Sequence, residues 1–425
     1  MNHTSDNQFT IPKGAWLTVF LLFFVGALNY FDRMMIATMR ESIVSAIPMT
    51  DAQFGLLTSV FLWVYALFSP VAGFIADRFK KSRVIIGSLF VWSGVTWMTG
   101  HAATFNELLV ARALMGISEA FYIPAALSLI IDYHKGPTQS IATGLHIAGT
   151  VVGQSMGFIG GWIAEKYLWS YAFNIFGVVG VLYSVFLIFT LKEAPSTSVD
   201  QSSAGKEKSS IKLLDALKAL FGTRSFVYLF CFWGMMGIVG WMVIGWLPTY
   251  YKEQFHLSQS MAGVYATAYM YPMAIVGLLL SGLFADKWTK TNSYARILVP
   301  VIGLSIAVPC IFLGSHSSIL IFAVIFFMGY SLTRASVDAN LMPVLCMVVD
   351  GRYRATGYGL MNMFATCIGG IGIYAAGALR DSHINLGIVY QIASLSIVVC
   401  VGLLLLVRRD AERQKNNVFN NQIKS

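Results

Sequence analysis

The sequence predicts an all-α polytopic membrane protein, and three observations support this fold class. First, 56% of the 425 residues are hydrophobic and 12% are charged, whereas soluble domains are about 45–50% apolar and about 25% charged. Second, the apolar residues occur in runs of about 20, the length of a helix that crosses a bilayer. Third, these runs lack the alternation of barrel strands. The composition therefore excludes a soluble enzyme and a disordered chain.

Twelve apolar runs are long enough to span a membrane, and a polar stretch divides them into two sets of six. The predicted spans are 15–38, 53–76, 84–101, 105–132, 139–165, 168–191, 225–250, 260–285, 294–313, 318–347, 354–379 and 385–407. The first run shows no small-residue cleavage site and is predicted to be a retained helix.

The polar stretch from Lys192 to Lys212 is rich in serine, which is typical of a flexible linker. The amphipathic residues 211–221 are expected to lie along the membrane surface. Four segments are therefore predicted: an N-terminal six-helix bundle at 1–191, a cytoplasmic linker at 192–224, a C-terminal six-helix bundle at 225–407 and a cytoplasmic tail at 408–425.

The distribution of lysine and arginine predicts the orientation of the chain. If the N-terminus is inside, 22 of the 29 basic residues fall in inner segments and four fall in outer loops, at Arg40, Lys166, Lys252 and Arg380. Inner loops carry the excess of positive charge in membrane proteins. Both termini and the linker are therefore predicted to be cytoplasmic. The net charge of +9 reflects this bias at the lipid bilayer and indicates no nucleic-acid partner.

Motifs for ATP hydrolysis and for metal or disulfide sites are missing from the sequence. The five cysteines lie in apolar segments and form no CxxC pair, so we expect no disulfide framework and no metal site. No Walker or HExxH motif is present, so we expect neither ATP-driven transport nor a zinc enzyme. We expect no cofactor, and an ion gradient is the remaining energy source.

The two halves of the chain carry the same loop motif after their second spans. Gly73 is followed by Asp77 and Arg78, and the later copy has Gly282 followed by Asp286 and Lys287. An aspartate at such a loop can accept hydrogen bonds from a neighbouring helix N-terminus, while the basic residue stays at the inner surface. The motif predicts a conformational latch that holds one state and breaks in another.

The charged residues inside the spans are the main functional candidates, because each costs about 2.5–3.5 kcal/mol at a helix centre. In the first span, Asn29 and Arg33 are four residues apart and share a face, and Tyr30 lies three residues before Arg33. Asp32 lies about 100° away from Arg33 around the helix. The two charges are therefore expected to face different partners, although Asp32 could also simply neutralise Arg33 or Arg112.

The fourth span places Arg112 and Glu119 seven residues apart, and so on one face. Glu119 has no basic neighbour at i+3 or i+4. We expect it to be buried and unpaired, and such a carboxylate takes up a proton readily. The tenth span holds Arg334 and Asp338 at i,i+4, which fits either a functional pair or a self-neutralising structural pair.

The architecture and the loop motif resemble the major facilitator superfamily. The resemblance rests on the two sets of six spans, the central loop and the signature Gly73-x-x-x-Asp77-Arg78-x-x-x-x-Arg83. It departs from that signature at Lys80, where glycine is usual. It implies two six-helix bundles around a central cavity that opens alternately to each side.

The charged motifs are similar to those of the anion:cation symporter family. They are Asn29-Tyr30-x-Asp32-Arg33 and Arg112-x-Leu-x-Gly-x-x-Glu119-Ala. The resemblance implies that Arg33 binds a substrate carboxylate, that Asp32 and Glu119 carry protons with Arg112 beside them, and that Tyr65 contacts the substrate. Further substrate-binding candidates are Tyr30, Asn29, Gln154, Arg334 and Asn362.

The resulting expectation is a proton-coupled symporter of a small organic anion such as a hexuronate or aldonate, and not an enzyme. The alternative is a lysolipid or sphingolipid transporter, because the spinster branch of the superfamily shares both charged motifs and Arg352-Tyr-Arg354 is similar to it. That alternative predicts an apolar lateral opening between the bundles. We expect a monomer in the bacterial inner membrane.

Overall fold

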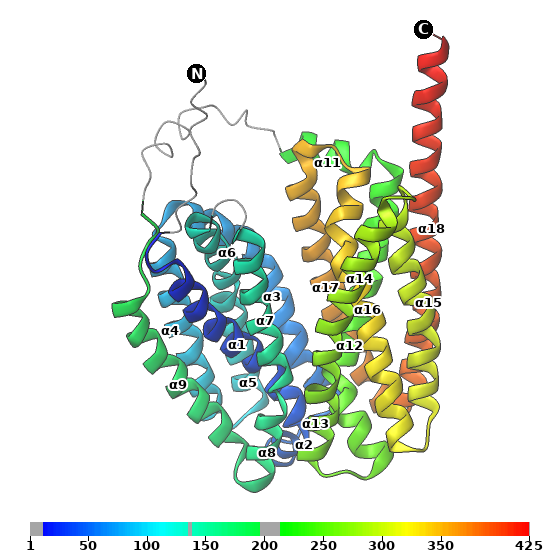
Figure 1. Ribbon diagram of the computed structural model, residues 1–425. Helices are drawn as coiled ribbons and strands as arrows, with labels where there is room; N and C mark the ends of the chain where they lie inside the picture. The colour runs from blue at the N-terminus through cyan, green and yellow to red at the C-terminus, as the bar shows by residue number, and fades with distance from the viewer. Residues whose placement is uncertain (1–11, 135–137, 196–212, 425) are drawn as a thin grey trace.

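A computed structural model describes residues 12–134, 138–195 and 213–424, and it is helical throughout, with no strand in those ranges. The helices form two bundles that lie side by side (Figure 1). Most of the predicted linker, residues 196–212, lies outside the described residues. Eleven helices in the described ranges are long and apolar enough to cross a membrane.

The N-terminal bundle is built from residues 15–190. Its helices are α1 (Ala15–Thr38), α2 (Arg40–Ala46), α3 (Asp51–Arg78), α4 (Lys81–Thr99), α5 (Phe105–Ala120), α6 (Tyr122–Tyr133), α7 (Gln139–Ser155), α8 (Phe158–Lys166) and α9 (Trp169–Thr190). The predicted span that is not among the eleven helices is the third, which is α4. It has 19 residues and packs against α9 and α5.

The C-terminal bundle follows α11 (Leu213–Phe221), the short helix in the predicted amphipathic stretch. Its helices are α12 (Arg224–Phe255), α13 (Gln259–Val264), the π-helix η2 (Tyr265–Tyr269), α14 (Met270–Thr289), α15 (Ala295–His316), α16 (Leu320–Val348), the 3-10 turn η3 (Gly351–Tyr353), α17 (Arg354–Asp381) and α18 (Leu386–Lys424). No break separates the last span from the predicted tail, because α18 continues to Lys424.

Three of the predicted spans are interrupted helices. The fourth breaks at Phe121 between α5 and α6, and the fifth breaks at Met156–Gly157 between α7 and α8. The eighth contains the π-helical turn η2. Such turns are frequent at functional sites, and they let a span bend without leaving backbone groups unbonded in lipid.

Both ends of the described chain lie at the same end of the molecule. The start of α1, the short helix α11 and the end of α18 are all at this end, which we call the linker end (Figure 1). Helices α2, α8 and α13 lie at the opposite end, called here the distal end. An even number of crossings in each bundle gives this arrangement, and it agrees with the prediction that both termini share one side.

A row of glycines lets α7 and α8 pack closely against α1. A Cβ atom added at Gly149 or Gly153 would overlap the backbone of Phe23 or Ala27, and one at Gly157 would lie 2.8 Å from the Cβ of Met34. Close approach of this kind is the usual role of small residues four apart in membrane helices. The row therefore fixes the position of α1, which carries Arg33.

Replacing Gly153 with alanine is expected to lower stability by about 1–3 kcal/mol, because the added methyl group overlaps the carbonyl oxygen of Ala27. Thermal unfolding of the purified protein in detergent measures the loss. Gly144→Ala in the same helix is the control, because a Cβ there meets nothing within 4 Å. Equal melting temperatures for the two variants would contradict the packing argument.

Candidate functional site

The centre of the N-terminal bundle holds a buried ion pair between α1 and α5. The Nε of Arg33 lies 2.7 Å from Oε2 of Glu119, and the two side chains are 4% and 0% exposed. The prediction that Glu119 is unpaired is therefore wrong. Counting i+3 and i+4 neighbours finds partners within one helix only, whereas this partner comes from another helix.

Aromatic rings surround the guanidinium of Arg33. Its Cζ lies 4.6 Å from the ring centre of Tyr65, 4.7 Å from that of Tyr30 and 5.1 Å from that of Phe61. Aromatic faces attract a cation, and the attraction is stronger where water is excluded. The structure thus brings together three of the predicted residues, Tyr30, Arg33 and Tyr65.

The buried pair leaves hydrogen-bonding capacity unused. Nη2 of Arg33 and Oε1 of Glu119 are buried and have no hydrogen-bond partner among the described residues. The same is true of Oδ1 and Nδ2 of Asn29. Buried polar atoms without partners are rare and are unfavourable. The arrangement therefore offers donors to one further acceptor, such as a carboxylate.

Asp32 points away from this pair, as its position on α1 predicted. Its Oδ2 accepts a hydrogen bond of 3.2 Å from Oγ1 of Thr96 on α4, and its Oδ1 is buried without a partner. Among the described residues it forms no ion pair with Arg33 or Arg112. Direct neutralisation of either arginine is thus not its role in this state.

Arg112 is as deeply buried as Glu119. It is fully buried, its Cζ lies 4.6 Å from the ring centre of Phe61, and its Nε donates to the carbonyl oxygen of Leu57 at 3.4 Å. No carboxylate bonds to it within the described residues. With Asp32 and Glu119 ionised, the four charges of the N-terminal bundle sum to zero.

A second polar centre lies in the C-terminal bundle. Nη1 of Arg334 lies 2.9 Å from Oδ2 of Asp338, and the two side chains are 27% and 35% exposed. Both line a cavity of about 620 Å³ between α7, α12, α14 and α16, together with Gln154 and Tyr271. The cavity lies at the junction of the two bundles, where carriers of this architecture bind substrates.

One side of this cavity is apolar and faces outward. Ile141 and Leu145 of α7 line it opposite Leu278 and Leu279 of α14, and all four side chains are exposed. The cavity is therefore open along the line where α7 and α14 face each other.

Asn362 does not line this cavity. Its Oδ1 accepts a 2.9 Å hydrogen bond from Nε1 of Trp233, which joins α17 to α12. Among the substrate-binding candidates it therefore has the weakest geometric support.

The predicted latch residues make no contact between the bundles in this state. Asp77 forms no hydrogen bond or ion pair within the described part of the chain, and Arg78 lies over the ring of Phe74, 4.0 Å from its centre. Asp286 pairs with Arg296 at 2.6 Å, Lys287 is exposed, and Gly73 has open space around it.

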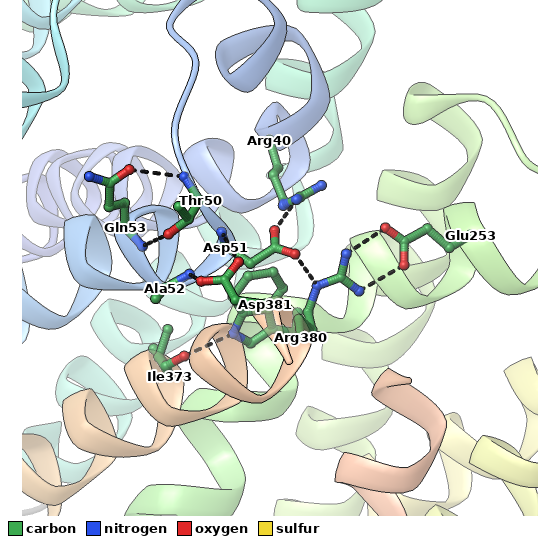
Figure 2. Close-up of polar contacts among 10 residues, drawn as sticks. Arg40, Thr50, Asp51, Ala52, Gln53, Glu253, Ile373, Arg380 and Asp381 are labelled. Atoms are coloured by element: carbon green, nitrogen blue, oxygen red, sulfur yellow. Dashed lines mark hydrogen bonds and ion pairs between the residues drawn. The ribbon is translucent and has the colours of Figure 1, made fainter. Parts of the chain in front are cut away.

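The distal end has the kind of contact that was predicted for the linker end. Asp381 of α17 accepts hydrogen bonds from the first backbone N–H groups of α3, and Arg380 beside it pairs with Asp51 (Figure 2). From the sequence alone, Arg380 and Arg40 are expected only to be outer-loop charges. The sequence feature that could have indicated this contact is the Thr50-x-x-Gln53 pattern, which marks the exposed start of a helix.

Two helical bundles with a cavity at their junction that holds an Arg–Asp pair, and charges inside spanning helices, define a membrane transporter. The chain belongs to the major facilitator superfamily, whose family profile matches residues 22–373 and 241–424. Its fold and family are thus those of transporters and not of enzymes.

Similar proteins include spinster homologues and a D-galactonate transporter. Protein spinster homolog 1 of Xenopus laevis is 25% identical over 394 residues, covering 87% of this chain and 73% of the relative. The D-galactonate transporter of Escherichia coli O6:H1 is 24% identical over 422 residues, covering 92% and 95%. A bacterial homologue of the human lysosomal transporter Spinster, solved in an inward-facing and occupied conformation, has a TM-score of 0.73 at 22% identity, covering 95% and 98%.

Removing either partner of the Arg33–Glu119 pair is expected to destabilise the protein by about 3–5 kcal/mol, because the other charge stays buried without a partner. Replacing both, with Arg33→Met and Glu119→Leu, is expected to restore most of that loss. Thermal unfolding of the two single variants and the double variant measures the coupling. Additive losses in the double variant would show that the two groups do not depend on each other.

Proposed function

We propose that the protein is a proton-coupled symporter of a small organic anion, with sugar acids such as aldonates and hexuronates as the substrate class. The observation that carries the proposal is the buried Arg33–Glu119 pair, with a free guanidinium nitrogen inside an aromatic enclosure. The D-galactonate transporter among the relatives supports the same substrate class. The proposed location is the bacterial inner membrane, with the linker end in the cytoplasm.

Coupling follows from the charge balance around Arg33. While Glu119 is ionised, it occupies the guanidinium, which therefore has little attraction for another anion. A proton on Glu119 removes that competition, and a proton on Asp32 removes a second negative charge near the site. The group then carries +2, and Arg33 can bind a substrate carboxylate through two hydrogen bonds.

Release follows from the same balance. When the site opens to the cytoplasm, loss of the protons restores the Arg33–Glu119 pair, which displaces the bound carboxylate. After release Arg33 therefore regains a carboxylate partner, and the costly state in which both charges are buried and unpaired is avoided. In this proposal Tyr30, Asn29 and Tyr65 hold the acid end of the substrate. Gln154, Arg334 and Asp338 bind its hydroxyl groups, because an exposed Arg–Asp pair offers donors and acceptors side by side.

A spinster-like lysolipid transporter is the second candidate. The apolar wall of the cavity, formed where Ile141 and Leu145 face Leu278 and Leu279, favours it, because an acyl chain can lie along such a wall. The spinster homologues among the relatives also fit. Transport of a lysolipid without a requirement for Arg33 would decide for this candidate.

Uptake into proteoliposomes under an inward proton gradient tests the proposal. D-galactonate and D-glucuronate are expected to accumulate, whereas galactose is not. Arg33→Ala is expected to abolish uptake, since a charged hydrogen-bond partner of the substrate is lost. Glu119→Gln is expected to keep exchange of substrate across the membrane and to lose accumulation driven by the gradient.

The control variant is Arg296→Gln, which removes an arginine from a surface pair at the linker end. It is expected to transport at a rate close to that of the unmodified protein. A lysophosphatidylcholine arm is run in the same vesicles. Movement of the lysolipid alone, or of the acids in Arg33→Ala, would contradict the symporter proposal.

A further inference from the structure

Charged side chains at the distal end form a network that joins the two bundles. Its members are Arg40 of α2, Asp51 of α3, Glu253 of α12, and Arg380 and Asp381 of α17, called here the distal lock (Figure 2). None of these residues belongs to the site around Arg33. The polar contacts found between the bundles in the described ranges lie in their distal halves, so this end is the closed one.

Two contacts of the distal lock cross from one bundle to the other. The Nε of Arg380 lies 2.9 Å from Oδ2 of Asp51. The carboxylate of Asp381 accepts from the backbone N–H groups of Asp51 and Ala52 at 2.8 and 3.0 Å. The first N–H groups of a helix have no partner within it and carry partial positive charge, so a carboxylate binds there favourably.

Two other contacts stay within a bundle. The Nη1 and Nη2 of Arg380 bind both oxygens of Glu253 at 2.7 Å each, and these residues belong to the C-terminal bundle. Arg40 pairs with Asp51, and both belong to the N-terminal bundle. Each arginine therefore has a carboxylate partner on its own side, and only Arg380 has one on both sides.

Both arginines of the distal lock lie over the ring of Trp246 of α12. The Cζ atoms of Arg40 and Arg380 lie 5.7 and 5.3 Å from its ring centre, and its Nε1 donates to the carbonyl oxygen of Ile373 at 3.1 Å. The ring is fully buried and belongs to the same bundle as Arg380. It therefore holds Arg380 in place whether or not the bundles are joined.

We propose that Asp51 and Glu253 compete for Arg380, and that this competition sets how readily the distal end opens. When the bundles separate, Arg40–Asp51 stays with one and Arg380–Glu253 stays with the other. Opening then leaves no guanidinium without a carboxylate. Within the distal lock only Asp381 loses all its partners, and it is an exposed residue that water can solvate. The neighbouring pair of Lys252 and Glu41 also crosses between the bundles and separates on opening, and both of its side chains are partly exposed. The distal lock therefore holds the distal end closed, and breaking it costs little free energy.

The competition predicts opposite effects for two substitutions that change charge in the same way. Asp51→Asn removes the pair between the bundles and is expected to raise the distal-open population roughly two- to fivefold. Glu253→Gln removes the competitor, so Arg380 depends on Asp51 alone, and the distal-open population is expected to fall by a similar factor. If each ion pair simply stabilised the closed state, both substitutions would raise the distal-open population.

Double electron–electron resonance between spin labels at Ser45→Cys and Ser382→Cys measures the two populations. Both positions are exposed at the distal end, one on each bundle, and the five native cysteines are replaced first. The comparison is made in an Asp381→Asn background. The Asp381→Asn substitution removes the charge at the start of α3 and is expected to populate the distal-open state. A decrease in that population can then be observed.

Glu107→Gln is the matched control, because this carboxylate caps its own helix at the same end and joins no other bundle. Glu253→Asp, which keeps the charge, is expected to restore the distances of the background protein. A shift of Asp51→Asn and Glu253→Gln in the same direction, or no open population with Asp381→Asn, would overturn the proposal. No substrate is present in the measurement, so its outcome is independent of the proposed transport activity.

Discussion

The buried pair of Arg33 and Glu119 is the interaction on which the rest of the structure depends. Two charges 2.7 Å apart inside a membrane protein are stable only while each has the other or a substitute. The glycine row that seats α7 against α1, and the aromatic rings around the guanidinium, hold Arg33 where α5 presents Glu119. A carboxylate-bearing substrate is such a substitute, which is why the pair suits an anion transporter.

The same principle recurs at the distal end. Arg380 also binds two carboxylates, Asp51 across the bundles and Glu253 within its own, and in the proposed opening it keeps only Glu253. The difference is the surroundings. The pair around Arg33 is closed off from water and is proposed to respond to protonation and substrate, whereas Glu253 is half exposed and is proposed to respond to the separation of the bundles. In both proposals an arginine keeps a carboxylate partner when the state of the protein changes.

Sequence reasoning went furthest where the relevant neighbours lie on one helix. Apolar run length located the spans, and helical geometry placed Asp32 and Arg33 toward different partners. It failed where a partner comes from another helix, as with Glu119, which was expected to be unpaired. It also missed the distal lock, because Asp51 and Arg380 are far apart in sequence and meet only through packing. The aspartate-on-helix contact predicted near Asp77 occurs in this state at Asp381.

The central claim is that a substrate carboxylate replaces Glu119 on Arg33 only when Glu119 holds a proton. Proton exchange during binding tests it most directly, with purified protein in weakly buffered detergent solution, a pH-sensitive dye and the acid found in the uptake assay. The account predicts net proton uptake on anion binding, of which the share at Glu119, about one proton per anion, is lost in Glu119→Gln although the anion still binds. Anion binding with no proton uptake, or with equal uptake in Glu119→Gln, would contradict it.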